Sequence, residues 1–201
     1  RNRLQVMAWQ NLVTGDDGLN RCGWVGSDAE YMRYHDEEWG VPQPGDQLMF
    51  EKIALEGFQA GLSWITILRR RPGFRAAFHD FDIDTVASYT DADVERLMND
   101  ERIIRNKAKI NAVIKNARIT QELVANKPGA LYDLVWEHKP AIQNPTREHI
   151  TDIPAVTPES EALSKTLRKM GFSFVGPTTM YALMQSEGLV DDHVVGCHRA
   201  H

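Results

Sequence analysis

The stretch GDQLMFEKIALEGFQAGLSWITILRRR, residues 45–71, sets the fold class, because its apolar side chains recur at the spacing of a helix. The small and apolar residues on this spacing are Phe50, Ile53, Ala54, Gly57 and Gly61. Side chains three and four positions apart lie on one face of a helix, and an apolar face is normally buried. The stretch therefore predicts a helix that breaks near Gly61 and runs into a second helix.

Helical periodicity continues through the rest of the chain. Further helical patterns cover residues 27–39, 90–98, 103–124, 128–138, 157–172 and 176–190. Capping boxes are expected at two helix starts, with Ser27 paired to Glu30 and Thr90 paired to Asp93. No stretch alternates in the manner of a strand between turn signals. The predicted fold class is all-α, with a folded domain over 19–201. Residues 1–18, which end in the turn-like GDDG, are expected to form an arm or tail of unknown role.

Composition excludes several classes of protein. The chain has 201 residues, of which 42% are hydrophobic and 25% charged, so it can bury one good core. No apolar run approaches the roughly 20 residues that span a bilayer, and we expect no membrane partner. Two cysteines do not make a disulfide framework, and we expect a cytoplasmic monomer with reduced thiols. The net charge of −5 argues against a uniformly basic surface but permits a local basic patch.

Cysteine and histidine occur in two pairs near opposite ends of the chain. Cys22 precedes His35, and His193 precedes Cys197 at a separation of four residues, which can place both on one face of a helix. Two sulfurs and two imidazoles complete a tetrahedral zinc site and leave no position for an activated water. Such a site would be structural.

Spacing alone leaves other interpretations of these residues open. Cys22 and Cys197 could be ordinary buried thiols, and His193 a polar residue with internal hydrogen bonds. His198 and His201 are competing ligands.

Aromatic residues are dense near the N-terminal side of the domain. They are Trp24, Tyr31, Tyr34, Trp39 and Trp64. Each could fill a core, or together they could form a stacking pocket for a flat ligand, whose positive charge aromatic faces attract.

Glu56 lies in the largely apolar segment ALEGFQAG. It could face solvent and pair with Lys52 one helical turn earlier, which is common on helix surfaces. It could instead be a buried carboxylate that recognises hydrogen-bond donors and a positive charge.

A basic segment, residues 97–110, spans an expected helix–turn–helix junction. Its cations are Arg102, Arg105, Lys107 and Lys109. Such a junction can offer backbone amides and cations to phosphates, although a solvated basic face explains the same pattern.

Taken together, these motifs resemble one family, the bacterial 3-methyladenine DNA glycosylases I. The matching stretches are RCGWV, YMRYHDEEWGVP, FEKIALEGFQAGLSWITILRRR, FRAAFHDFD, RIIRNKAKINAVIKNA and GFSFVGPTTMYALMQSEGLVDDHVVGC. The resemblance extends from about residue 21 to 197 and leaves residues 1–18 without a counterpart.

The resemblance implies a helix–hairpin–helix architecture of two helical subdomains, with the base pocket between them and the hairpin near 98–108. It places a structural zinc ion on Cys22, His35, His193 and Cys197, where the ion joins the N- and C-terminal segments. It places base recognition, and the catalytic contribution, on Glu56 with Tyr34 and Trp64, and sets Trp24, Tyr31 and Trp39 nearby.

The implied activity is base-excision repair of alkylated double-stranded DNA. The enzyme would flip 3-methyladenine out of the duplex and release it by hydrolysis, leaving an abasic site without strand cleavage. The hairpin of such enzymes usually carries glycine, so Arg102 is expected at a position that favours a left-handed backbone. Two other functions also fit some of the residues: a non-catalytic zinc-stapled binding module and a zinc hydrolase.

Overall fold

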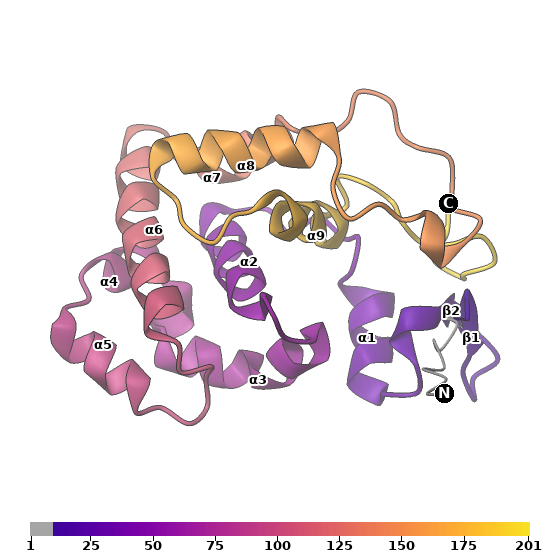
Figure 1. Cartoon of the computed structure of the whole chain (residues 1–201), viewed down its shortest axis with the longest axis horizontal. Helices are drawn as coiled ribbons and strands as arrows, with labels where there is room; N and C mark the ends of the chain where they lie inside the picture. Colours follow the sequence, from indigo (N-terminus) through magenta and orange to yellow (C-terminus); the bar gives the residue numbers. More distant parts are fainter. Residues whose placement is uncertain (1–9) are drawn as a thin grey trace, which may run out of the picture.

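A computed structural model describes residues 10–201, in which the chain forms nine α-helices, three short 3-10 helices and a two-stranded antiparallel sheet (Figure 1). The helices are α1 (Ala29–Glu37), α2 (Asp46–Gln59), α3 (Trp64–Ala77), α4 (Ile83–Ala87), α5 (Asp91–Met98), α6 (Lys107–Asn126), α7 (Ala130–Trp136), α8 (Pro158–Met170) and α9 (Pro177–Glu187), with η1 (Gly23–Val25), η2 (His79–Phe81) and η3 (Ile150–Asp152) between them. The predicted helical fold is confirmed, apart from the sheet. Within residues 10–201, every helix is too short or too polar to cross a lipid bilayer.

The predicted break near Gly61 is confirmed. Helix α2 ends at Gln59 and α3 begins at Trp64. Gly61 lies between them with a φ of +83°, a left-handed conformation that side chains disfavour and glycine adopts readily. The break turns the chain so that the end of α2 and the start of α3 can face the same cavity.

Of the two predicted capping boxes, one is confirmed and one is wrong. Thr90 and Asp93 cap α5 reciprocally, as expected. At α1 the N-cap is Asp28 and not Ser27, because the Asp28 carboxylate accepts a hydrogen bond of 3.0 Å from the Tyr31 amide. Both residue types favour the N-cap, so the sequence could not distinguish these neighbours.

The sheet corrects the expectation of a chain without strands. Strand β1 (Leu12–Thr14) pairs with β2 (Asn20–Cys22), and Val13 lies opposite Arg21. Each strand has three residues, too few to display alternation in the sequence. Strand β1 belongs to the segment expected as an arm, so residues 12–14 are part of the folded body. Residues 1–9 of that arm lie outside the described residues.

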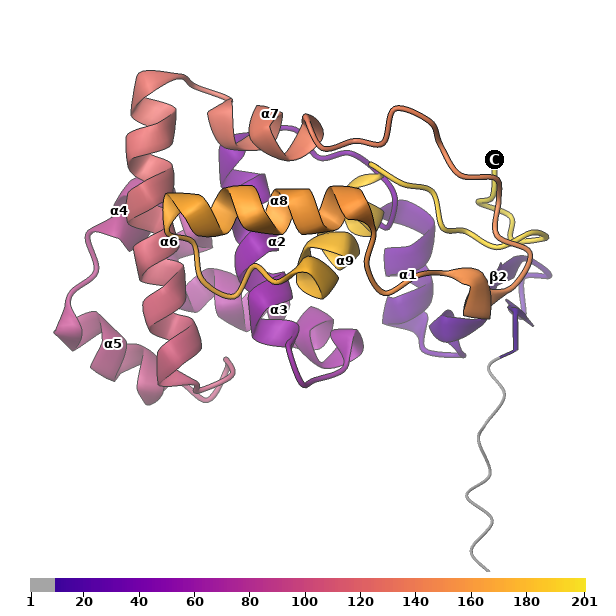
Figure 2. The same cartoon turned by 45° about the horizontal axis from the view of Figure 1, so that its top comes forward.

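Two hydrophobic cores form the interior. The larger core is built from α2–α9. The smaller one gathers residues from β2, η1, α1, the segment after α1 and the C-terminal segment, among them Cys22, Val25, Tyr34, Trp39 and Cys197. Both views show α1, the sheet and the C-terminal segment together at one end of the molecule (Figures 1 and 2). Trp64 packs against both cores. The smaller part combines one α-helix with a sheet and extended chain, so it is less helical than the expected subdomain.

Candidate functional site

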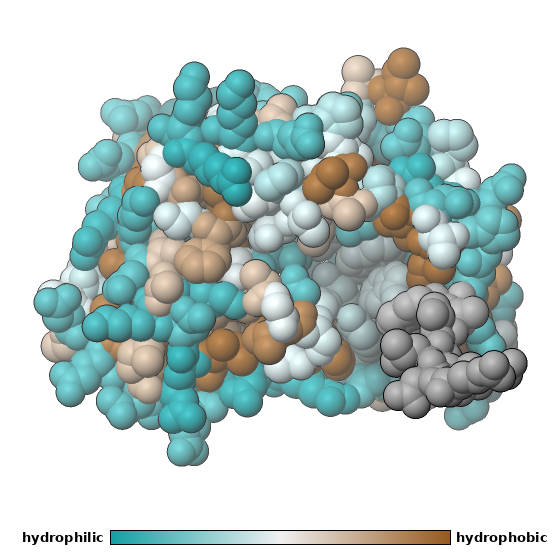
Figure 3. Space-filling model, in the orientation of Figure 1, coloured by the Kyte–Doolittle hydropathy of each residue, from teal (hydrophilic) through white to brown (hydrophobic). Residues whose placement is uncertain are grey.

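A cavity of about 500 Å³ lies between the two cores. All six residues expected to recognise a base line it: Trp24, Tyr31, Tyr34, Trp39, Glu56 and Trp64. They come from η1, α1, α2, α3 and the segment after α1. The space-filling view shows the molecular face hollowed between the part that contains α3 and α9 and the part that contains α1 (Figure 3). The fold therefore brings these six residues, which lie between positions 24 and 64 of the sequence, to one pocket.

The aromatic rings of the pocket contact each other mostly edge to face. The ring centroid of Trp24 lies 5.0 Å from that of Tyr31 and 5.1 Å from that of Trp39. Tyr34 and Trp64 lie 5.8 Å apart in a tilted arrangement. Such pairs are favourable beyond the area they bury and hold each ring in place. The pocket therefore has rigid aromatic walls.

Several wall residues were not anticipated from the sequence. They are Gln59, Ile150, Thr151, Ile153, Ala182 and Gln185. Most come from η3 and α9, more than 80 positions away from the predicted cluster. Nothing in their local sequence distinguishes them, because it is the packing of η3 and α9 beside α1 that brings them to the cavity.

Glu56 is buried, with 4% of its surface exposed, so of the two alternatives the solvent-facing pair with Lys52 is wrong. The ammonium of Lys52 lies 2.5 Å from a carboxylate oxygen of Glu187. Among the described residues, no hydrogen bond reaches the Glu56 carboxylate. Burial raises the pKa of Glu56 to about 8, and the nearby charge of Lys52 opposes this only in part. The pocket thus contains an acidic group without a protein partner.

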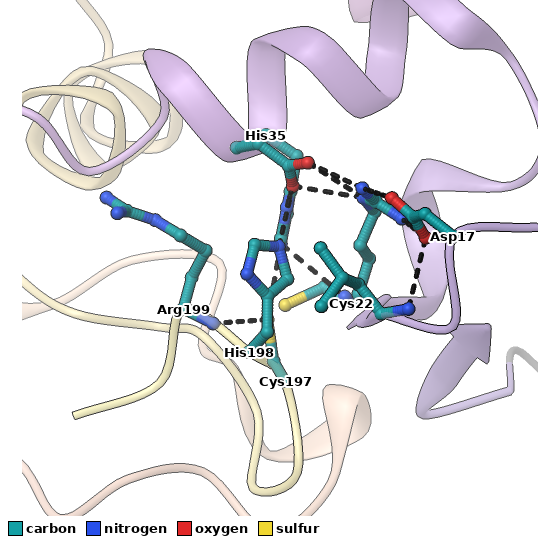
Figure 4. A network of polar contacts seen from close by, with 9 residues as sticks. Asp17, Cys22, His35, Cys197, His198 and Arg199 are labelled. Carbon is teal, nitrogen blue, oxygen red and sulfur yellow. Dashed lines mark hydrogen bonds and ion pairs between the residues drawn. The ribbon is translucent and has the colours of Figure 1, made fainter. Parts of the chain in front are cut away.

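Three of the four expected metal ligands meet in the smaller core. The ligand atoms of Cys22, His35 and Cys197 all lie within 4.8 Å of one another. The sulfur of Cys197 is 3.4 Å from Nε2 of His35, and a hydrogen bond from Cys22 lowers the pKa of Cys197 below its ordinary value. Figure 4 shows both sulfurs beside the ring of His35. The N- and C-terminal segments therefore meet at a cluster with soft sulfur and imidazole donors.

His193, the fourth expected ligand, lies beside this group but not within it. Its ring centroid is 5.2 Å from that of His35. Nδ1 of His193 contacts the Asp191 carboxylate at 2.6 Å, and Nε2 is buried with no hydrogen-bond partner among the described residues. His35 is held in the same way, by a 2.8 Å contact between its Nδ1 and Asp36. A carboxylate that holds Nδ1 leaves Nε2 as the nitrogen that can face a metal, which is the usual arrangement of zinc-binding histidines.

A second group of potential ligands consists of His35, Asp36 and His198. Its contacts are hydrogen bonds, since one oxygen of Asp36 lies 2.8 Å from Nδ1 of His35 and 2.8 Å from Nε2 of His198. Arg21 adds a bidentate contact to the same carboxylate. Although burial alone would raise the pKa of Asp36, these hydrogen bonds together hold it well below its ordinary value. His198 is therefore occupied by Asp36, whereas Nε2 of His193 has no hydrogen-bond partner among the described residues.

The basic segment separates into exposed and buried cations. Arg102, Arg105 and Lys107 are exposed in the connection between α5 and α6 or at the start of α6. Lys109 is buried, and its ammonium donates hydrogen bonds of 2.9 and 2.8 Å to the carbonyls of Phe58 and Ala60. It satisfies carbonyls left free at the end of α2. Lys109 is thus not available to phosphates, contrary to expectation.

The left-handed backbone expected at Arg102 is also absent, since Arg102 is not among the described residues with positive φ. Its side chain forms an ion pair with Asp100 and its amide donates to the same carboxylate. A Cβ atom on Gly73 would lie 2.6 Å from Cβ of Arg102. The connection between α5 and α6 therefore requires a glycine on α3, at Gly73, because α3 packs closely against Arg102 there.

The chain is similar to known proteins of one family. The sequence model of the family described as methyladenine glycosylase matches residues 24–200. DNA-3-methyladenine glycosylase 1 of Escherichia coli is 50% identical over 182 residues, which cover 89% of this chain and 96% of that protein. The DNA-3-methyladenine glycosylase of Haemophilus influenzae is 46% identical and covers 88% of this chain and 96% of its own length.

Solved structures give the same result. A crystal structure of 3-methyladenine DNA glycosylase I superposes with a TM-score of 0.85 at 46% identity, covering 89% of this chain and 98% of the other. The Staphylococcus aureus enzyme, solved to study recognition of 3-methyladenine, superposes with a TM-score of 0.80 at 32% identity, covering 85% of this chain and 91% of the other.

The helical fold and the cavity, seen beside these relatives, define the class of protein as a DNA glycosylase, a hydrolase of N-glycosyl bonds. Within that class, the chain belongs to the methyladenine glycosylase family.

Proposed function

We propose that this enzyme takes 3-methyladenine out of alkylated double-stranded DNA, binds it in the aromatic pocket and hydrolyses its N-glycosyl bond, leaving an abasic site. The observation that carries the proposal is the buried carboxylate of Glu56, which has no hydrogen-bond partner within residues 10–201 and lines the cavity with five aromatic residues. A buried acid without a hydrogen-bond partner destabilises a fold, so its presence in the lining of a cavity points to a ligand that supplies the missing contacts.

The chemistry of 3-methyladenine in DNA matches these contacts. The alkylated base carries a formal positive charge, and its amino group donates hydrogen bonds. Aromatic faces attract such a cation by about 0.5–2 kcal/mol. Contact with a cation favours the ionised form of Glu56, which then accepts hydrogen bonds from the adenine edge. Guanine presents an acceptor where adenine has its amino group, so the carboxylate favours adenine.

The charge on the base also accounts for the hydrolysis step. A cationic base is a good leaving group, so breaking its bond to the sugar needs little acid catalysis. Water then adds to the anomeric carbon. No lysine is present among the residues that line the cavity in the described chain, so the pocket offers no amine for a covalent step with strand cleavage. We therefore propose a monofunctional enzyme.

Reaching the base requires contact with the DNA backbone and rotation of the nucleotide out of the stack. Rotation costs a few kcal/mol, and less for a damaged base that pairs poorly. We assign phosphate contact to the exposed cations Arg102, Arg105 and Lys107. The overall charge of −5 means that such contact depends on a local patch.

We assign a zinc ion to the cluster of Cys22, His35, His193 and Cys197. The two sulfurs, the free Nε2 of His193 and the carboxylates that orient both histidines fit this ion. Bound there, zinc supplies a cross-link between the two ends of the domain. His35 directly follows Tyr34, so ligation of His35 would also fix the helix that carries a pocket wall.

The experiment that tests the proposal is incubation with methylated DNA, followed by chromatography of released bases and electrophoresis of the strand. We expect release of 3-methyladenine from an intact strand. Glu56→Gln should reduce release about 10- to 100-fold, because a charged hydrogen-bond partner of the base is lost. Glu95→Gln is the matched control, since Glu95 is exposed on α5. A wild-type protein that releases no base would refute the proposal.

A further inference from the structure

We infer that Asn11 is a positioning residue for the base pocket, because it ties two of the pocket walls together from the N-terminal side. The inference rests on the proposed function, since it assumes that the cavity binds the base. Asn11 lies just before β1 and outside residues 24–200, the range that matches the family. Its contribution would therefore be additional to the family's shared pocket.

The side chain of Asn11 holds the wall that contains η3. Oδ1 of Asn11 accepts a hydrogen bond of 3.0 Å from the amide of Ile150, and Nδ2 donates at 2.9 Å to the carbonyl of Glu148. Nδ2 is also 2.7 Å from Nδ1 of His149. Three consecutive residues are thus held by one side chain. Ile150 and the next residue, Thr151, both line the cavity.

The backbone of Asn11 holds a second part of the cavity wall. Its carbonyl accepts a hydrogen bond of 2.8 Å from the amide of Gly23, the residue directly before Trp24 in η1. A Cβ atom on Gly23 would lie 1.5 Å from the carbonyl oxygen of Gln10, so only glycine permits this close approach. One residue therefore joins the segment that carries Trp24 to the segment that carries Ile150.

Contacts from other segments are needed to hold η3 in place, because η3 is a single turn. Its internal backbone bonds run from Asp152 to His149 and from Ile153 to Ile150. A turn with so few bonds opens easily unless other segments hold it. Asn11 is itself anchored, since Leu12 pairs with Cys22 in the sheet and packs closely on Gly196.

The test compares Asn11→Ala with Thr14→Ala, a control three residues later in β1. Within residues 10–201, the side chain of Thr14 forms its hydrogen bond with Asn20 of β2 and forms none with η3. We expect Asn11→Ala to weaken the binding of free 3-methyladenine about 3- to 10-fold. The substitution removes the net free energy of about one hydrogen bond, which keeps η3 in its position at the cavity. The amide of Ile150 should exchange with solvent faster. In base release, kcat should fall while KM for DNA stays constant, because the phosphate contacts lie elsewhere. Thr14→Ala should leave the affinity for 3-methyladenine, the exchange rate of the Ile150 amide and kcat unchanged.

The outcomes separate this inference from the proposed function. If wild type binds 3-methyladenine and Asn11→Ala binds it equally well, the positioning role is refuted. The role is also refuted if affinity is lost only in proportion to unfolding, measured as melting temperature and metal content. If wild type does not bind the base, the proposed function fails, and exchange at Ile150 still reports whether Asn11 holds η3.

Discussion

The Cys/His cluster and the aromatic pocket lie side by side on α1, yet their charged groups are arranged in opposite ways. Tyr34 faces the pocket and the next residue, His35, faces the cluster. Beside the cluster, Asp36 has three cationic or imidazole partners, which lower its pKa. In the pocket, Glu56 has no hydrogen-bond partner among the described residues, and its pKa is raised to about 8. Groups with partners stabilise the fold, whereas a group without one is available to a ligand.

The largest effect should follow from breaking the cluster. Cys22→Ala, or treatment with a chelator, should lower the free energy of unfolding by at least about 4 kcal/mol, because the zinc ion that we propose at this cluster would contribute its binding free energy to folding. Denaturant unfolding combined with metal analysis measures this. His198→Ala is the control, since His198 contacts Asp36 and is not an assigned ligand.

Chelation could instead abolish base release while the protein stays folded. That result would make the metal catalytic and would remove the distinction between a structural cluster and a reactive pocket.

Removing the charge of the pocket carboxylate Glu56 should raise the free energy of unfolding, whereas breaking the cluster should lower it. Glu56 has a pKa of about 8 in the fold and about 4.5 when unfolded, so between these values the unfolded chain holds fewer protons. Stability contributed by the protonated group is therefore present below pH 4.5 and is lost as the pH rises towards 8. Glu56→Gln cannot ionise and should be about 2–4 kcal/mol more stable than wild type at pH 8. Urea unfolding at pH 4.5 and 8 measures the difference, which should nearly vanish at the lower pH.

Asp36→Asn is the matched change beside the cluster. It removes a carboxylate that is bonded to Arg21, His35 and His198, so we expect a loss of about 1–3 kcal/mol at neutral pH. If both substitutions changed stability in the same direction, the contrast between partnered and unpartnered acids would not hold.

The smallest effects concern two lysines at the start of α6. Lys107 is exposed and has no hydrogen bond or ion pair among the described residues, whereas Lys109 bonds two carbonyls. Lys107→Ala should reduce the slope of log affinity for DNA against log salt by about 1 without changing stability. Lys109→Met should cost about 1–2 kcal/mol of stability and leave the slope unchanged. Binding titrations at several salt concentrations measure the slope, and melting curves measure the stability. If Lys109→Met changed the slope and Lys107→Ala changed the stability, the assigned roles would be exchanged.

Local features of the fold were predictable from the sequence. The break at Gly61 and the cap at Thr90 depend on backbone preferences of a few neighbouring residues. The pairing of β1 with β2 was not predictable, because strands of three residues carry too little pattern. The burial of Lys109 also escaped prediction, since its carbonyl partners are about 50 positions away in the sequence.

In the candidate site, too, some features were predictable from the sequence and others were not. Residue type and spacing were enough to nominate the cysteines, histidines and aromatic residues, because their chemistry is carried by the side chains themselves. For Glu56 the sequence left two environments open, and its burial beneath the aromatic rings resolved them, since a pKa depends on surrounding dielectric and charge. The wall from η3 and its attachment to Asn11 join residues about 139 positions apart, and packing of the folded chain alone makes such contacts. The sequence thus specified which groups could react, and the three-dimensional arrangement specified which of them lack partners.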